Sequence, residues 1–124
     1  MELVDQLLAA VEQGLVEPVL ALLAKGVNVN AHDNRGNTAL HTACMGKGGH
    51  EKMDMALILL EKGALLEDTN LELRTALHIA CEKNIDEILS VELISRGANL
   101  YAVDKVSYAL MTLKIIYIHE YFHL

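Results

Sequence analysis

Two nearly identical heptapeptides, TALHTAC at residues 38–44 and TALHIAC at residues 75–81, decide the fold of this chain. They differ only at their fifth position and begin 37 residues apart. A second marker follows a similar period, because the apolar runs ALLAKG, ILLEKG and LISRG each close on a glycine, at Gly26, Gly63 and Gly97. Two independent markers at one period indicate internal repeats, in which each unit buries its apolar face against its neighbours.

The residue types in each heptapeptide predict the start of a helix. Thr38 and Thr75 carry hydroxyls that can accept a bond from a free backbone N–H at the helix N-terminus. An apolar stripe follows, and the glycine that ends the next apolar run suits the left-handed residue at a helix C-terminus. A short turn-rich stretch follows each of these glycines.

These motifs resemble the ankyrin repeat, whose signature is T-P-L-H-x-A and whose period is near 33 residues, over about residues 5–105. The resemblance implies an all-α solenoid of helix-turn-helix units with β-turn fingers. It divides the chain into an N-terminal capping repeat at 1–34, a repeat with an inter-helix loop insertion at 35–71, a repeat at 72–105, and a degenerate helical cap at 106–124. Ala39 and Ala76 stand where the signature has proline.

The capping and middle repeats carry further local signals. In the first repeat, Asp5 is predicted to cap the first helix, Gly14 to end it, and Pro18 to fall in the first turn of the second helix. Leu8 stands in the place of the signature histidine. In the middle repeat, MGKGGHEK is predicted to form a glycine-rich loop between the helices. The second helix is then expected to turn four residues inward: Met55, Ile58, Leu59 and Leu60.

Composition excludes several functional classes. The chain has 124 residues, of which 52% are hydrophobic, and a net charge of −7, without the basic surface that a nucleic-acid-binding protein needs. The N-terminus lacks the basic segment of a secretion signal, and the apolar stretch at 108–124 is too polar and too short to span a membrane. We expect a cytoplasmic protein, with the nucleus left open, that needs no cofactor.

Histidines and cysteines recur within the repeats. The resemblance implies that His41 and His78 have a structural role, each ring forming a hydrogen bond with the backbone of the finger or of a neighbouring repeat. Cys44 and Cys81 follow the small alanine of each first helix, and their repeat spacing predicts small core residues rather than reactive thiols.

By resemblance, the partner of such a stack is another protein, bound by finger tips and first-helix faces, and the module is not an enzyme. Leu71 and Leu73 lie near a finger tip, where they either pack on a neighbour or form an apolar anchor for the partner. Glu12 and Gln13 continue the surface into the first repeat. The expected partner-facing residues are Asn34, Arg35, Asn37, Met45, Leu71, Glu72, Arg74, Glu82 and Lys83.

The C-terminal string HEYFHL supports a rival hypothesis, because H-E-x-x-H on a helix is typical of zinc hydrolases. His119 and His123 would be ligands and Glu120 the general base. A catalytic zinc needs three protein ligands, however, and only Leu124 follows the motif. An apolar stripe through the same segment instead predicts a helix that covers the end of the stack, or a strand. A third hypothesis is a structural fragment whose apolar C-terminal segment pairs with itself or with a missing domain.

Overall fold

The computed structural model describes residues 2–45, 50–83 and 87–98, and every regular element within these ranges is a helix. The helices form three consecutive pairs. They are α1 (Leu3–Gln13) with α2 (Val16–Ala24), α3 (Ala39–Met45) with α4 (His50–Glu61), and α5 (Ala76–Lys83) with α6 (Glu87–Ser95). The expected all-α repeat architecture is confirmed for this part of the chain.

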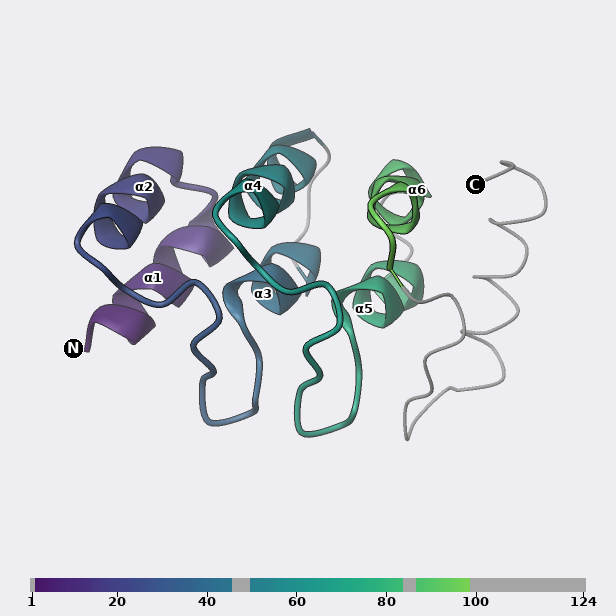
Figure 1. Ribbon diagram of the computed structural model, residues 1–124, viewed down its shortest axis with the longest axis horizontal. Coiled ribbons are helices and arrows are strands. Elements are labelled where there is room, and N and C mark those ends of the chain that lie inside the picture. The colour runs from purple at the N-terminus through teal and green to yellow at the C-terminus, as the bar shows by residue number, and fades with distance from the viewer. Residues whose placement is uncertain (1, 46–49, 84–86, 99–124) are drawn as a thin grey trace.

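The pairs stand side by side as two rows (Figure 1). The first helices α1, α3 and α5 form one row, the second helices α2, α4 and α6 form the other, and the loops after α2 and α4 descend as two fingers. The main packing joins each first helix to its own second helix and to the next first helix along the stack. The core consequently lies between the rows, and its largest apolar side chains are Leu7, Val11, Leu40, Met55, Leu59, Leu77, Ile79 and Leu93.

Several local predictions are confirmed. Gly14, Gly26, Gly63 and Gly97 all adopt positive φ at the ends of helices, and Pro18 lies in the first turn of α2. Cys44 and Cys81 are buried, the latter with Sγ 3.6 Å from Ser90 Oγ.

Other predictions need correction. The N-cap of α1 is Glu2, whose side chain makes no capping bond, and Asp5 lies within the first turn. Of the four residues expected to point inward from the second helix of the middle repeat, Met55 and Leu59 are fully buried, but Ile58 is only half-buried. Leu60 is likewise half-buried and packs at the edge of the core. The inter-helix loop is shorter than expected, since α4 begins at His50.

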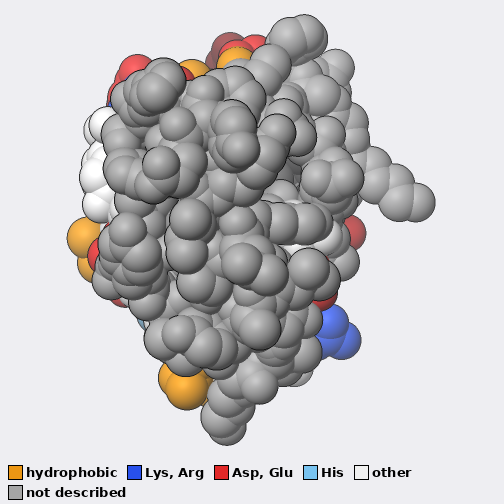
Figure 2. Space-filling model, turned by 90° about the vertical axis from the view of Figure 1, so that its right-hand side faces the viewer, with side chains coloured by type: hydrophobic (Ala, Val, Ile, Leu, Met, Phe, Trp, Pro, Cys, Tyr) orange, Lys and Arg blue, Asp and Glu red, His pale blue; other side chains and the backbone are white. Residues whose placement is uncertain are grey.

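Residues 46–49 and 99–124 lie outside the described ranges, so the glycines of the loop, the third finger and the C-terminal segment are not placed. Figure 2 turns the α6 end of the stack toward the viewer, and the described side chains visible at its rim are mainly acidic or hydrophobic. Within the described ranges, no helix has the length and apolar content needed to cross a membrane.

Candidate functional site: a groove between the fingers and the first helices

The first finger closes around a single aspartate. Asp33 Oδ1 accepts hydrogen bonds from the backbone N–H of Arg35 at 2.8 Å and of Asn37 at 2.9 Å. The Asp33 N–H donates to Asn37 O, and the Gly36 N–H donates to Asp33 O, both at 3.0 Å. A carboxylate that accepts two backbone donors in this way fixes a tight turn, as aspartate commonly does. Arg35 is thereby held at the finger tip.

The second finger repeats this arrangement around Asn70. Its Oδ1 accepts the N–H of Glu72 at 2.9 Å and of Arg74 at 3.1 Å, and its own N–H donates to Arg74 O at 3.0 Å. Asn70 lies 37 residues after Asp33, so the two fingers have equivalent turns. An amide oxygen therefore does in the second finger what a carboxylate does in the first.

Hydrogen bonds join the two fingers into one wall. The Leu71 N–H donates to Arg35 O, and Asn70 Nδ2 donates to Asn37 Oδ1, both at 3.0 Å. Closer to the helices, His41 Nδ1 accepts the Thr38 N–H at 3.0 Å, which leaves the proton on Nε2 for donation to Arg74 O at 2.9 Å. The backbone role expected of His41 is confirmed. His78 repeats the local half of this pattern, with its Nδ1 3.2 Å from the Thr75 nitrogen.

The finger tips differ in their side chains although their turns are equivalent. Gly36 has φ 79°, and Leu73 at the corresponding place in the second finger has φ 63°. Asn34 in the first finger corresponds to Leu71 in the second, which is 69% exposed, while Leu73 is 47% exposed. Of the two interpretations left open for this pair, the structure favours exposed side chains over packing on a neighbour.

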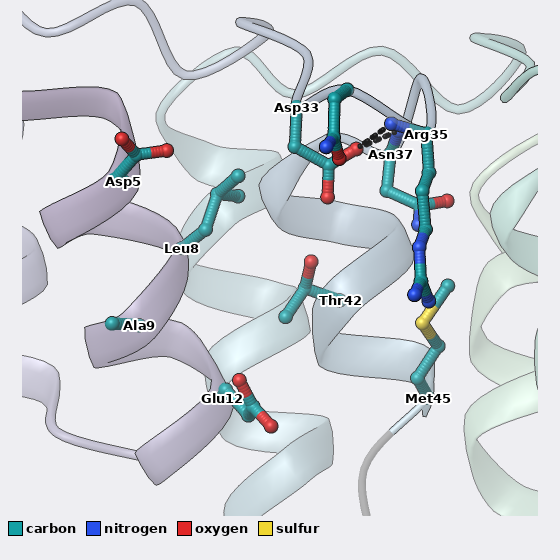
Figure 3. Close-up of a pocket in the computed structure, with 10 residues that line it drawn as sticks. Asp5, Leu8, Ala9, Glu12, Asp33, Arg35, Asn37, Thr42 and Met45 are labelled. Carbon is teal, nitrogen blue, oxygen red and sulfur yellow. Dashed lines mark hydrogen bonds between the residues drawn. The ribbon is translucent and has the colours of Figure 1, made fainter. Parts of the chain in front are cut away.

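A hollow of about 530 Å³ lies between α1 and the first finger. In Figure 3, Asp5, Leu8, Ala9 and Glu12 line it from α1, and Thr42 rises from α3 between the two walls. The opposite wall is formed by the finger and the end of α3: Asp33, Asn34, Arg35, Asn37 and Met45.

A second hollow, of about 270 Å³, continues along the stack toward the second finger. It adds Asn70, Leu71 and Glu72 to four residues that also line the first hollow: Asn34, Arg35, Asn37 and Met45. Because the two hollows share these residues, we treat them as one surface and call it the finger groove.

The finger groove has an uneven charge. Carboxylates of Asp5, Glu12 and Asp33 line its α1 end, where Arg35 is the only basic residue among the described residues that line the first hollow. The Arg35 side chain lies beside Met45, on the wall opposite α1 (Figure 3). Behind the groove, burial lowers the pKa of His41, and the hydrogen bond to the Arg74 carbonyl only partly opposes this shift.

The structure brings six of the nine expected partner-facing residues into the groove: Asn34, Arg35, Asn37, Met45, Leu71 and Glu72. Asn37, however, is only 6% exposed, and Arg74 is 7% exposed and forms an ion pair with Glu82. Arg74 is thus a buried part of the second finger and not the exposed contact that its position suggested. The Lys83 side chain is outside the described part, and Gln13 is exposed but does not line the groove.

Sequence reasoning identified Glu12 but missed the rest of the α1 wall. Asp5, Leu8, Ala9 and Glu12 follow an i, i+3, i+4, i+7 spacing, which places them on one face of a helix. That spacing could have identified the wall, had Asp5 not been interpreted as a cap. Asp33 and Asn70 could have been found from their shared place in the repeat. Three further residues line the groove although the sequence analysis did not predict them there: Asp33, Thr42 and Asn70.

The zinc hypothesis concerns residues that the structure does not describe, namely His119, Glu120 and His123. In the described ranges, no group of three or more His, Cys, Asp or Glu side chains is arranged to hold a metal ion. The finger groove is therefore the candidate site that the described residues offer.

Comparison with known families agrees with this architecture. A family model described as ankyrin repeats in three copies matches residues 7–104. Ankyrin repeats generally mediate protein–protein interactions and are typically non-enzymatic. The match covers most of the chain, and its residues include α1 from Leu7 onward, the other five helices and both fingers. The chain belongs to the ankyrin repeat family.

Proposed function

We propose that this chain is an interaction module that binds a partner protein along the finger groove and catalyses no reaction. The observation that carries the proposal is the continuity of the two hollows through Asn34, Arg35, Asn37 and Met45. A partner could therefore contact α1, both fingers and α3 at once. The cytoplasm remains the proposed location.

The rigidity of the groove supports the same conclusion. Asp33 and Asn70 fix the turn of each finger, and the bonds from Leu71 to Arg35 and from Asn70 to Asn37 fix the fingers relative to each other. A surface that is ordered before binding loses less conformational entropy when the partner docks. The repeat boundaries at 34/35 and 71/72 remain a proposal, and each would divide the chain within a finger.

The two alternative functions depend on residues 106–124. A zinc hydrolase would use the HEYFH motif, and a self-associating subunit would use the apolar C-terminal segment. Neither gains support from the described helices and fingers, so we propose the interaction module alone.

A paired pull-down tests the proposal. The chain is used as bait beside a groove variant that carries Arg35→Glu and Leu71→Asp. A control variant carries Lys62→Glu and Leu65→Asp, two exposed residues that do not line the groove. We expect partners to be retained by the chain and by the control but lost from the groove variant, with all three unfolding at similar temperatures, because exposed substitutions usually change stability by only about 0.5 kcal/mol. Partners that depend on the control residues and not on the groove would contradict the proposal.

A further inference from the structure

We infer that the finger groove binds an extended basic segment of its partner, with a Lys or Arg side chain in the hollow against α1 and an apolar side chain against Leu71. The inference rests on the proposed function and specifies the chemistry of the partner. Two features of the groove carry it: its charge and the composition of the second finger tip.

The charge of the first hollow favours a cation. Asp5 and Glu12 approach it from α1 and Asp33 from the finger, and among the described lining residues only Arg35 is basic. Charges of one sign that line a concave surface raise the local concentration of the opposite charge, because the low-dielectric walls focus the field. The net charge of −7 acts in the same direction at longer range.

The second finger supplies the apolar contact. It has Leu71 and Leu73 where the first finger has Asn34 and Gly36, and both leucines are exposed. Leu73 holds a left-handed backbone that disfavours a branched side chain. Leu71 lines the second hollow, so an apolar residue of the segment would meet it there.

Selection from a displayed library of random peptides tests the inference. We would use peptides of about 12 residues, long enough to run along the groove when extended. We expect the enriched peptides to combine Lys or Arg with an apolar residue at a fixed separation. Their binding should weaken with Leu71→Ser, which removes the apolar contact without adding a charge, and should weaken as salt is added, because exposed charge pairs are screened.

Matched neutralisations then locate the cation. Asp5→Asn with Glu12→Gln removes two charges from the groove, and Glu17→Gln with Glu61→Gln removes two exposed charges from α2 and α4. Both variants lose the same net charge, so any difference between them reports the groove alone. We expect the Kd of a selected basic peptide to rise about tenfold in the first variant and less than about twofold in the second. The ¹⁵N-labelled side-chain amide of Asn37 should shift in the NMR spectrum when the peptide is added.

The outcomes separate the two proposals. Groove-dependent peptides that are acidic or neutral, an equal loss in both neutralised variants, or the absence of any enriched groove-dependent peptide would overturn the basic-segment inference and leave the proposed function standing. Peptides that ignore both Leu71→Ser and the neutralised groove variant, together with pull-down partners that ignore the Arg35→Glu/Leu71→Asp variant, would overturn both. A concentration-dependent dimer in sedimentation, abolished by Arg35→Glu/Leu71→Asp, would assign the groove to a second copy of the chain and overturn the inference.

Discussion

Leu73 is the residue at which the two fingers diverge most. It has φ 63°, and Gly36 has φ 79° at the same place one repeat earlier. A left-handed backbone brings Cβ close to the following carbonyl oxygen and costs about 1–2 kcal/mol for a residue other than glycine. Leu73 is 47% exposed, so the packing of its side chain offsets little of this conformational cost. The fold tolerates the strain because the Asn70 turn fixes the finger from within.

Leu73→Gly should therefore stabilise the protein. Relief of the strain is partly offset by the greater entropy of glycine in the unfolded chain, about 0.5–1 kcal/mol, so we expect a net gain of about 0.5–1 kcal/mol. The midpoint of urea unfolding measures it. Leu71→Gly is the matched control, because the same substitution at an exposed site without positive φ should lower stability. An increase of similar size in both variants would show that strain is not the cause.

His41 links the stability of the stack to pH. Burial lowers the pKa of its ring below the ordinary 6.5, so the folded protein favours the neutral form. As the pH falls below about 6.5, the unfolded chain therefore binds more protons at this histidine than the folded protein does. The free energy of unfolding decreases with falling pH until the pH lies below the pKa of the folded state. Above about pH 6.5, the stability that depends on the neutral His41 ring is fully present.

Urea midpoints at about pH 7.5 and pH 5.5, on either side of the ordinary histidine pKa, measure this effect. We expect the chain to lose stability between the two pH values, and His41→Gln to lose less because glutamine does not titrate. The other histidines contribute to both proteins. An equal loss in the two would show that the buried ring is not responsible.

At the scale of elements, side-chain amides hold successive repeats in register. Asn30 Oδ1 accepts the Leu65 N–H at 2.9 Å, and its Nδ2 donates to Gly63 O at 3.1 Å, so one side chain joins the loop after α2 to the loop after α4. Each such hydrogen bond contributes about 0.5–1.5 kcal/mol to the net free energy of unfolding. These links act where the fingers leave the helices.

We expect Asn30→Ala to lower the free energy of unfolding by about 1–2 kcal/mol, because both bonds are lost together. Asn34→Ala makes the same change at an exposed position on the finger tip and should cost less than about 0.5 kcal/mol. Denaturant unfolding of the two variants provides the comparison. If their midpoints coincide, the amide links do not contribute measurably to the register of the repeats.

The sequence predicts elements of this kind better than it predicts their surfaces. The heptapeptides and the closing glycines locate the helices because a period of 37 residues repeats the same capping and packing requirements. The exposure of a finger residue depends on what the fold places beside it. Arg74 is charged and stands near a finger tip, yet it is buried against Glu82, a residue of α5. The α1 wall of the groove likewise exists only because the first finger folds back opposite α1.

At the scale of the whole molecule, stability is expected to vary along the stack. Packing joins α1 mainly to α2 and α3, whereas α3 contacts α1, α4 and α5. In a repeat stack, total stability is approximately the sum of unit terms and neighbour interfaces, so an end unit can open alone while a central unit cannot. Leu7 in α1 and Leu40 in α3 are each 1% exposed, and they offer the same side chain in an end unit and in a central one.

Leu7→Ala and Leu40→Ala should each cost about 2–5 kcal/mol through lost burial and the cavity that remains. Their effects on amide hydrogen exchange should differ. Leu7→Ala should speed exchange in α1 and α2 while the amides of α5 and α6 keep their protection, because the end unit can separate at the α1–α3 interface. Leu40→Ala removes packing shared by both sides of the stack, so exchange should accelerate in all six helices. Uniform acceleration in both variants would show instead that the three helix pairs unfold as one unit, and that the groove cannot open locally at its α1 wall.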